Sequence, residues 1–581
     1  MVTLNINGQQ VSVPEKTTIM EAAEKIGIHI PHLCFLKDIN EIGACRVCLV
    51  EVEGMDKLVP ACDTECREGM EVVTNSPRLR KIRRINVELI LSDHKSECTS
   101  CVKSGNCSLQ ALANDLGIIR SPFVENTAEK SRWDTKLPLI RDASKCIKCM
   151  RCIQICEKVQ SLGVWDLRGT GHRTTVGTRD NLDFQEADCA LCGQCITHCP
   201  VGALRERDDR DVLNDAIGDP EKVVIAQVAP AVRTAWGEQL GLPEEENTIG
   251  KLVCALKKIG IDYVFDTNYS ADLTIMEEGS EFLYRLAHKD EHKWPMFTSC
   301  CPGWVRFAKT QYPDMIENLS TAKSPQQMFG AVAKTYIAHK LGIDPDKVFS
   351  VSIMPCVSKK YERTVPQVNY NDEGFDVDLV LTTRELDRFV RSDKIRPEDL
   401  IDMPFDDIFG EGSGAAVIFG TTGGVMEAAL RSAYFLATGN NPEPDAFKDV
   451  RGNKGWREKT FDLDGTELRV AVASGLGNAR NLIEAVRAGE AEYDFVEIMA
   501  CPGGCVGGGG QPFKDGLELA EDRSRQLYEL DRKNEIRFSH ENSAVQLTYQ
   551  EYLGEPMSEK AHHLLHTDLK GWDIEMVRED T

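Results

Sequence analysis

The chain from residue 221 onward alternates short apolar runs with helical stretches. Strands that alternate with helices predict parallel sheets with helices on their faces. Functional sites in such sheets form at the carboxyl ends of the strands. The predicted strands lie in KVVIAQVAP (222–230), YVFDT (263–267), MFTSC (296–300), VFSVSIMPC (348–356), DLVLTT (378–383), AVIFGT (416–421), LRVAVASG (468–475) and YDFVEIMAC (493–501).

The first part of the chain has a different pattern. TLNINGQQVSV alternates polar and apolar residues around Asn7-Gly8, which predicts a β-hairpin. TTIMEAAEKIG predicts a short helix with Thr17 or Thr18 as its N-cap and Gly27 at its end. Residues 79–125 are polar and helical in pattern, and two cysteine-dense repeats of similar design follow them. We therefore expect a multidomain protein of mixed α+β and α/β class, with domains at 1–78, 79–125, 138–209 and 210–581.

Charge excludes some classes of function. The 581 residues include 68 Lys and Arg against 92 Asp and Glu, a formal net charge of −24. This balance argues against nucleic acid or an anionic membrane as a partner, because both require a positive face. No apolar run approaches the roughly 18 residues that span a bilayer, and the N-terminus lacks the apolar segment of a secretory signal. We therefore expect a cytoplasmic protein with reduced thiols and no membrane span.

Cysteine usage points to metal. The chain has 22 cysteines, and sixteen of them lie between Cys34 and Cys199. The spacing C-x2-C-x2-C-x3-C occurs twice, as in two-cluster bacterial ferredoxins, where each fourth cysteine ligates the other copy's cluster. Structural zinc rarely uses this triple spacing, so we favour iron–sulfur clusters. We predict one 4Fe–4S cluster on Cys146, Cys149, Cys152 and Cys199, and a second on Cys189, Cys192, Cys195 and Cys156.

An N-terminal set of cysteines predicts a 2Fe–2S cluster. Cys34, Cys45, Cys48 and Cys62 have the spacing C-x10-C-x2-C-x13-C, whose first gap is longer than that of plant-type ferredoxins. A start resembling a β-grasp fold together with a C-x2-C loop favours 2Fe–2S over zinc. Cys66 could compete for the fourth position. We favour Cys62, because ACDT continues directly from the strand KLVP, and interpret Cys66 as a spare thiol.

A fourth group combines one histidine with three cysteines. His94, Cys98, Cys101 and Cys107 have the spacing H-x3-C-x2-C-x5-C. In isolation this group fits zinc and a 4Fe–4S cluster about equally. Three neighbouring cluster motifs favour the 4Fe–4S cluster. Several clusters in about 200 residues form an electron wire, which implies a redox catalyst at one end.

The remaining cysteines locate that catalyst. TSCCPGW (298–304), MPCVSKK (354–360) and MACPGGCVGGGGQP (499–512) each follow a predicted strand. Strand ends on one side of a sheet are neighbours in space, and glycines allow the backbone to approach a bulky inorganic group. Buried core cysteines are the alternative, and five thiols in three Pro- and Gly-framed loops argue against it. These thiols are Cys300, Cys301, Cys356, Cys501 and Cys505.

These three motifs resemble the active-site signatures of FeFe-hydrogenases, and the whole chain resembles the many-cluster type of that family. The resemblance implies a two-lobed α/β catalytic domain with its active site between the lobes. It implies that Cys505 bridges a 4Fe–4S cubane to a di-iron subsite that carries CO, cyanide and azadithiolate. With one 2Fe–2S and three further 4Fe–4S clusters, this subsite would complete the cofactor set. The implied cubane ligands are Cys301, Cys356, Cys501 and Cys505.

The same resemblance implies a proton relay and a shell around the subsite. Cys300 would be the terminal proton donor, and Glu278, Ser320 and Glu281 would supply it, with Arg285 at the outer end. From the residues alone, MEEGSEF is typical of a solvated helix face, which is the alternative for both glutamates. Ala231 stands where many members of the family have a serine that hydrogen-bonds a cyanide. The shell itself would consist of Lys359, which would bind a cyanide, and of Met354, Met499 and Gln326.

Weaker signals have simpler interpretations. The loop from Gly475 to Arg480 lacks the third glycine of a dinucleotide motif, so we expect a strand–helix turn and no flavin or NAD site in this chain. Cys254 is expected in the core. We interpret His562, His563 and His566 as a surface feature, and WDIEMVREDT as an acidic tail available to a partner.

The sequence leaves three functional hypotheses. The favoured one is the catalytic subunit of an electron-bifurcating complex that links H2 to ferredoxin and NAD(P). Its partners would be ferredoxin, flavin- and NAD(P)-binding subunits, a small iron–sulfur subunit and maturation proteins. The second is a stand-alone ferredoxin-linked hydrogenase. The third is a non-catalytic iron–sulfur assembly or sensor protein, against which the intact Cys300, Lys359 and Cys505 argue.

Overall fold

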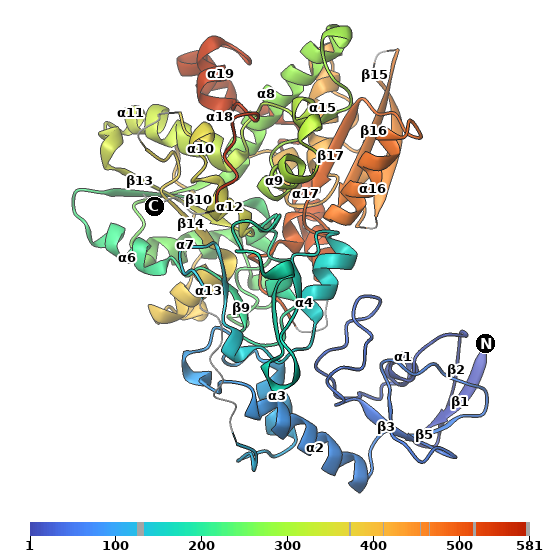
Figure 1. Cartoon of the computed structure of the whole chain (residues 1–581). Helices are drawn as coiled ribbons and strands as arrows, with labels where there is room; N and C mark the ends of the chain where they lie inside the picture. The colour runs from blue at the N-terminus through green and yellow to red at the C-terminus, as the bar shows by residue number, and fades with distance from the viewer. Residues whose placement is uncertain are drawn as a thin grey trace.

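The computed structural model describes residues 1–124, 133–370, 374–410, 412–453, 455–463, 465–514 and 519–576. In Figure 1 the N-terminal strands, in blue, form a sheet at one end of the molecule. The cysteine-rich region lies between this sheet and a large α/β part that contains the later strands and helices (Figure 1). The chain is a mixed α/β protein in which small N-terminal units lead to one large α/β unit.

The N-terminal unit is a five-stranded sheet with the order β2-β1-β5-β3-β4. Asn7 and Gly8 have φ angles of 51° and 84°, as a tight hairpin turn requires, so the predicted hairpin is confirmed. The strands are β1 (Val2–Ile6), β2 (Gln9–Val13), β3 (Leu49–Val52), β4 (Val59–Pro60) and β5 (Glu71–Val73).

Helix α1 (Ile19–Lys25) fixes the loop that carries Cys62. The Thr18 side chain accepts a hydrogen bond from the backbone of Glu21, whose carboxylate accepts one from the backbone of Thr18 in return. Thr18, and not Thr17, is therefore the N-cap. The backbone amide of Met20 donates to the carbonyl of Ala61, next to Cys62, at 2.9 Å. The cap thus holds the start of the helix against the cysteine loop.

Short elements carry the middle cysteines. β6 (Leu139–Arg141) pairs antiparallel with β9 (Leu204–Glu206) and brings the two ends of the region together. α4 (Arg151–Gln154) and α5 (Gln194–Thr197) occupy equivalent positions in the two cysteine repeats. β7 (Trp165–Arg168) and β8 (Thr175–Thr178) form a second antiparallel pair. Ahead of this region lie α2 (Pro77–Ser92) and α3 (Ser108–Asp115).

One four-stranded parallel sheet, with the order β11-β10-β13-β14, lies in the large unit. Alternating residues of β10, one of its two central strands, pack in two different hydrophobic cores. Val224 packs in the core that contains α7 (Ile249–Ile259), whereas Ile225 packs with residues of α8 (Thr267–Ala287) and α10 (Pro325–Val332). A strand covered on both faces is expected to be largely apolar, and β10 is apolar except for Gln227. The strands are β10 (Val223–Val228), β11 (Tyr263–Asp266), β13 (Val348–Met354) and β14 (Leu379–Thr382).

A second four-stranded sheet has the order β12-β17-β16-β15. β15 pairs antiparallel at its edge and was not predicted, because WREKTFDL is largely polar. α9 (Pro302–Gln311) follows β12, and α16 (Leu476–Arg487) follows β16 through a turn at Gly475, as predicted. The strands are β12 (Met296–Phe297), β15 (Trp456–Leu463), β16 (Thr466–Ser474) and β17 (Phe495–Met499).

One predicted strand is wrong. AVIFGT lies in the helical turns α14 (Gly414–Val417) and η14 (Ile418–Gly420), ahead of α15 (Gly424–Thr438). The Ser413 side chain caps α14 by accepting from the backbone amide of Ala416. Every residue of the run is buried, and a short apolar run buried on all sides has the same pattern in a strand and in a helix.

None of the helices in the described part of the chain combines the length and the apolar character that crossing a membrane would require. The predicted domain boundaries remain predictions, and residue 125 and residues 577–581 lie outside the described ranges.

Candidate functional site: a thiol-lined cavity and a buried relay

Three loops at strand ends meet around a small apolar cavity. Cys300 and Cys301 follow β12, Cys356 follows β13, and Cys505 lies beyond β17. All four line a cavity of about 80 Å³, so strand ends from both four-stranded sheets contribute to it. Other predicted residues that line the cavity are Ala231, Gln326, Met354, Lys359 and Met499.

The thiols at this site raise one another's pKa. Burial, reinforced by the thiols of Cys301 and Cys505, raises the pKa of Cys501 to about 12. Burial likewise raises the pKa of Cys356, and the thiols of Cys501 and Cys301 also contribute to that rise. All of the described cysteines are free, so no disulfide explains this convergence. Four mutually repelling sulfurs are a donor set for a cluster of soft metal ions, and a 4Fe–4S cubane fits them.

Glycines allow the loop of Cys505 to pack closely. Gly504 has a φ of 90°, which favours glycine over any other residue. A Cβ atom on Gly508 would lie 2.2 Å from the carbonyl oxygen of Pro355, beside Cys356. A Cβ atom on Gly509 would lie 2.2 Å from the carbonyl oxygen of Cys192. The glycine run therefore packs this loop against the backbone beside Cys356 and against the backbone of Cys192 at once.

Lys359 is fixed beside the cavity. Its Nζ donates to Glu362 Oε2 at 2.8 Å and to the carbonyl of Cys300 at 3.2 Å. Burial lowers the pKa of Lys359, but the Glu362 carboxylate outweighs it, and the pKa lies above its usual value. Gln326 donates to the same carboxylate at 3.1 Å, and its own Oε1 has no partner in the described residues. Lys359 is therefore a fixed positive charge beside the thiols.

The predicted relay residues lie together inside the protein. Glu278 and Glu281, on α8, are 1% and 4% exposed, so the solvated-face alternative is wrong. Ser320 Oγ donates to Glu281 Oε2 at 2.8 Å. Arg285 donates to Glu281 Oε1 at 2.6 Å. The helix spacing places the glutamates three residues apart on one face, and Ser320 reaches them from the segment after α9.

Burial gives Glu278 and Cys300 unusual acidities. Burial, reinforced by Glu281, raises the pKa of Glu278 to about 8. Burial also raises the pKa of Cys300 well above its usual value, and Glu278 contributes to that rise. Glu278 Oε2 has no hydrogen-bond partner among the described residues. Both groups therefore hold a proton at neutral pH, and each can pass it on.

The ferredoxin-like thiols fall into the two crossed groups that the spacing predicts. Burial raises the pKa of Cys152, followed by the influence of Cys149, Cys146 and Cys199. Burial and the Cys156 thiol raise the pKa of Cys189 to about 12. The fourth thiol of each repeat thus lies among the first three of the other repeat.

The N-terminal thiols converge in the same way. The sulfurs of Cys34 and Cys45 lie 3.4 Å apart, and so do those of Cys48 and Cys62. Cys66 lies apart from this group. Burial raises its pKa to about 11, and no thiol contributes to that rise. The geometry thus groups Cys62, and not Cys66, with the other three.

His94 is oriented like a metal ligand. Its Nδ1 lies 2.9 Å from the carbonyl oxygen of Lys145, so this nitrogen donates and Nε2 keeps a lone pair. Burial, with a contribution from Cys101, raises the pKa of Cys107. A Cβ atom on Gly202 would lie 2.4 Å from the sulfur of Cys101, which places this group against the loop after Cys199.

Close contacts connect the successive groups. The Asn40 side chain donates to the carbonyls of Cys34 and Cys149, at 2.6 and 2.9 Å. It therefore joins the N-terminal thiols to the first ferredoxin-like group. At the other end, Cys501 Sγ lies 3.7 Å from the carbonyl oxygen of Cys192. The thiol groups thus form one continuous series from the N-terminal unit to the cavity.

Sequence reasoning missed several partners in this site. Glu362 follows Lys359 by three residues on α12 (Ser358–Glu362), a spacing that could have revealed the ion pair. Thr321 also contacts Glu281, with its hydroxyl 3.1 Å from Oε1. No local signal identifies Asn40, because its partner Cys149 is 109 residues away.

The prediction of a C-terminal histidine surface is wrong for one residue. His562 and His563 are exposed, but His566 is buried and hydrogen-bonded to Glu277 and Thr321. α19 (Glu559–Leu565) turns only one face to solvent, and His566 is drawn inward just after it ends.

The described part of the predicted acidic tail, residues 572–576, packs on the protein, in contrast to the prediction of a tail available to a partner. The indole of Trp572 donates to Thr567 Oγ1 at 2.8 Å, and the Arg306 guanidinium binds the carbonyl of Ile574. These contacts pack residues 572–576 on the protein. Cys254, in contrast, lies in the core as predicted.

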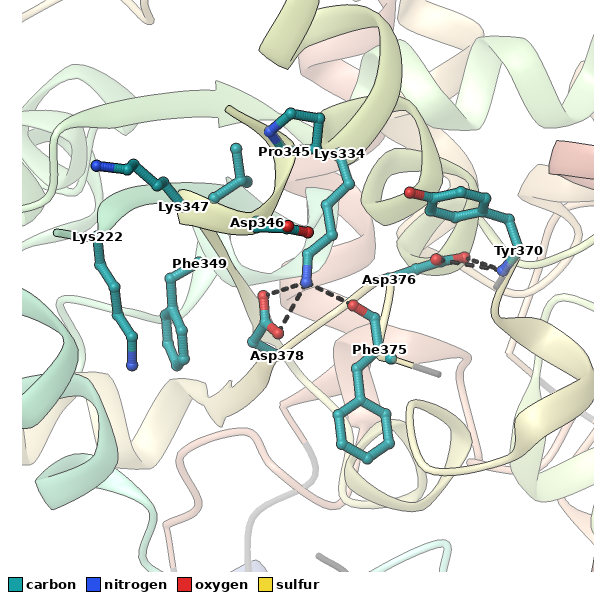
Figure 2. A pocket seen from close by; sticks show the side chains of 12 residues that line it. Lys222, Lys334, Pro345, Asp346, Lys347, Phe349, Tyr370, Phe375, Asp376 and Asp378 are labelled. Atoms are coloured by element: carbon teal, nitrogen blue, oxygen red, sulfur yellow. Dashed lines mark hydrogen bonds and ion pairs between the residues drawn. The ribbon is translucent and has the colours of Figure 1, made fainter. Parts of the chain in front are cut away.

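A larger surface cavity, of about 780 Å³, lies elsewhere (Figure 2). Lys334 extends into it and donates to Asp378 at 2.8 Å and to the carbonyl of Phe375 at 2.6 Å (Figure 2). No cysteine is among the residues that line this cavity. Its lysine Lys334 is already paired with Asp378, so the thiol-lined cavity is the better candidate for redox chemistry.

Profiles of known protein families match successive regions of the chain. The profile described as iron only hydrogenase large subunit, C-terminal domain, matches residues 222–509. Iron–sulfur profiles match the preceding regions: a 2Fe-2S binding domain at 1–77, an NADH-ubiquinone oxidoreductase-G iron-sulfur binding region at 83–122, and a 4Fe-4S dicluster domain at 145–203. An iron hydrogenase small subunit profile matches residues 517–570, within the region that the sequence assigned to the catalytic domain.

Individual proteins are similar over most of their length. The NADP-reducing hydrogenase subunit HndD from Solidesulfovibrio fructosivorans is 47% identical, over 98% of both chains. Iron hydrogenase 1 from Clostridium pasteurianum is 40% identical, over 98% of this chain and 100% of its own. A solved apo [FeFe]-hydrogenase from Chlamydomonas reinhardtii covers 61% of this chain and 98% of its own, with 44% identity and a TM-score of 0.55.

Close packing of the glycine loop leads to a prediction. We expect Gly509→Ala to destabilise the protein by about 1–3 kcal/mol, because its Cβ would overlap the Cys192 carbonyl. We also expect it to bind less iron per chain. Gly218→Ala is the control, since nothing lies within 4 Å of the new Cβ. Thermal unfolding and iron analysis of anaerobic protein measure both quantities, and equal values for the two variants would contradict the prediction.

Proposed function

The chain belongs to the iron-only hydrogenases and is an oxidoreductase of that family, and from this premise we propose that it interconverts H2 with two protons and two electrons at the thiol-lined cavity. The observation that carries the proposal is the meeting of three elements in one place. Four thiols and the fixed cation of Lys359 line the cavity, and a buried carboxyl relay leads to one of those thiols, Cys300, whose pKa Glu278 helps to raise.

The cysteine side chains would hold the metal. Cys301, Cys356, Cys501 and Cys505 would bind a 4Fe–4S cubane, with Cys505 also facing a di-iron subsite that carries CO, cyanide and azadithiolate. When bound, this group would supply the redox chemistry with H2. Lys359 would donate a hydrogen bond to an anionic ligand, while Met354 and Met499 exclude water from the apolar cavity. Ala231 Cβ offers no hydrogen bond where a serine would.

The relay residues would move the protons. Cys300, protonated because of its burial, would give a proton to the cavity and regain one from Glu278. Glu278 would be reprotonated through Ser320, whose hydroxyl would accept a proton from Glu281 and give its own to Glu278. Arg285 holds Glu281 in place from the outer side. General acid–base chemistry of this kind requires hydrogen-bond reach and matched acidities.

The other thiol groups would carry the electrons. Electrons would pass between the cavity and the group that includes Cys192, because this residue contacts Cys501. From the ferredoxin-like groups they would reach the His94 group or the N-terminal group through the contact at Asn40. Two outer groups offer two places where redox partners can exchange electrons.

We propose further that the chain acts as one subunit of a cytoplasmic NAD(P)- and ferredoxin-linked, electron-bifurcating complex. The similarity to a subunit of an NADP-reducing hydrogenase over 98% of both chains supports this assignment. The similarity to iron hydrogenase 1, whose name does not describe a subunit, supports the alternative of a stand-alone hydrogenase. Native purification decides between them: flavin-containing subunits that copurify with the chain support the complex, and a fully active single chain contradicts it.

Cys300 provides a direct test of the proton step. We expect Cys300→Ala to keep the iron content and to lose H2 evolution by roughly 100-fold or more, because it removes a proton carrier and no metal ligand. Cys254→Ala is the control, since this buried thiol lies in the core of α7. H2 evolution and iron analysis of matured protein measure the two effects. Unchanged evolution by Cys300→Ala would remove it from the relay.

The acidity of Glu278 leads to a pH dependence. Burial raises the pKa of this carboxyl to about 8, so it holds a proton below that pH and loses it above. H2 evolution should therefore fall as the pH rises through about 8. Glu278→Gln should abolish this transition and lower the rate by roughly 100-fold, whereas exposed Glu291→Gln should change neither. A pH profile of Glu278→Gln that overlays the wild-type profile would contradict the assignment.

A further inference from the structure

A second buried acid–base pair lies beside the relay and has no part in it so far. Glu277, on α8, is fully buried next to Glu278 in the sequence, and His566 is 4% exposed. His566 Nε2 lies 3.0 Å from Glu277 Oε2. The two residues are 289 positions apart, and the C-terminal segment brings them together.

The surroundings of Glu277 leave one place for a proton. The Tyr549 hydroxyl donates to Oε1, and the backbone amide of Met557 donates to Oε2 at 2.9 Å. Burial, reinforced by Glu277, raises the pKa of Tyr549 well above its usual value, so the phenol remains a donor. One proton on His566 Nε2 therefore fits between the ring and Glu277 Oε2, and a second proton on the ring would lie on Nδ1, which faces Thr321.

Thr321 connects this pair to the relay. Its hydroxyl lies 2.8 Å from His566 Nδ1 and 3.1 Å from Glu281 Oε1. Backbone pairing fixes the contact, because the amide of Thr567 donates to the carbonyl of Thr321 at 2.8 Å. The hydroxyl has one proton and faces two acceptors. If His566 is neutral with its proton on Nε2, the hydroxyl can donate to Nδ1. If His566 carries both protons, it donates to the hydroxyl, which must then donate to Glu281.

We infer that Glu277 and His566 form a proton-holding pair that supplies Glu281 through the hydroxyl of Thr321. In the transfer, the Nδ1 proton of His566 passes to Thr321 Oγ1 as the hydroxyl proton passes to Glu281 Oε1. After the transfer, His566 is a neutral imidazole whose Nε2–H still donates a hydrogen bond to Glu277, and Glu281 is a neutral carboxyl. No electron moves, and the charge lost by the imidazolium equals the charge neutralised on Glu281.

The neighbouring charges suit this role. On one side of the pair, Tyr549 contacts Glu277. On the other side, Glu281, which is held by Arg285, lies across Thr321. The exposed ring of His562 stacks on His566 with ring centroids 4.8 Å apart. The pair thus lies between the Tyr549 hydroxyl and the Thr321 contact with Glu281, beside a histidine that reaches solvent. Glu277, His566 and Thr321 act through Glu281, so they are positioning residues of the relay and not catalytic residues.

The inference rests on the proposed hydrogenase activity and is tested in the full-length matured protein. We expect Thr321→Val to lower H2 evolution severalfold and to change its pH profile, because the methyl group cannot transfer a proton. Thr321→Ser should restore both. His566→Gln should reproduce the effect of Thr321→Val, whereas His563→Gln, at an exposed histidine on α19 just before it, should have no effect. The loss should stay below the roughly 100-fold expected for Glu278→Gln, because the relay itself remains.

Two further measurements separate this inference from other effects. Melting temperature and iron content should match the wild type in Thr321→Val, which excludes a merely structural effect. Infrared difference spectra between acid and alkaline protein should lose or shift a carboxylic C=O band in His566→Gln. An inactive wild type would contradict the proposed function, whereas an active wild type with unaffected Thr321→Val and His566→Gln profiles would overturn this inference alone. Equal losses in Thr321→Val and Thr321→Ser would also overturn it.

Discussion

The burial of cysteine thiols in groups of four is the constraint on which the rest of the structure depends. An unliganded group of this kind is unfavourable, because burial raises the pKa of each thiol and its neighbours raise it further, as at Cys501 and Cys152. Metal binding requires deprotonated thiols and releases their protons, and the metal ions then balance the charges of the buried thiolates. The glycine loop, the strand ends and the crossed ferredoxin-like repeats all serve to bring sulfurs from distant positions within reach of one another.

In the proposed mechanism, protons and electrons would reach the cavity by different routes. Electrons would pass through the Cys192 and Cys501 contact, whereas protons would pass through the buried carboxyls of α8. A helix face with three buried glutamates is costly, and each carboxylate is stabilised by a distinct set of donors. Ser320, Thr321 and Arg285 serve Glu281, while Tyr549 and His566 serve Glu277. Glu278 alone is left with an oxygen that has no partner in the described residues, and it is the group that faces Cys300.

Sequence predicted the parts of this site that depend on local spacing or on a run of pattern. The crossed cysteine repeats, the Asn7-Gly8 hairpin and the strands before each thiol motif fall in this class. AVIFGT was mispredicted because a fully buried run looks alike in either secondary structure. Burial of Glu278 and Glu281 could not be predicted from α8 itself, because the residues that cover it come from other segments. His566 and Asn40 act through contacts across more than 100 residues, for which a single sequence has no signal.

The central claim is that the cavity holds a di-iron site with diatomic ligands and exchanges electrons with H2. Infrared spectroscopy of protein matured with its assembly machinery and purified without oxygen, under H2 and then under CO, tests it most directly. The account predicts sharp CO and cyanide bands whose positions change with the gas. The absence of such bands in matured protein that retains its iron–sulfur clusters would contradict the account and leave an iron–sulfur electron carrier.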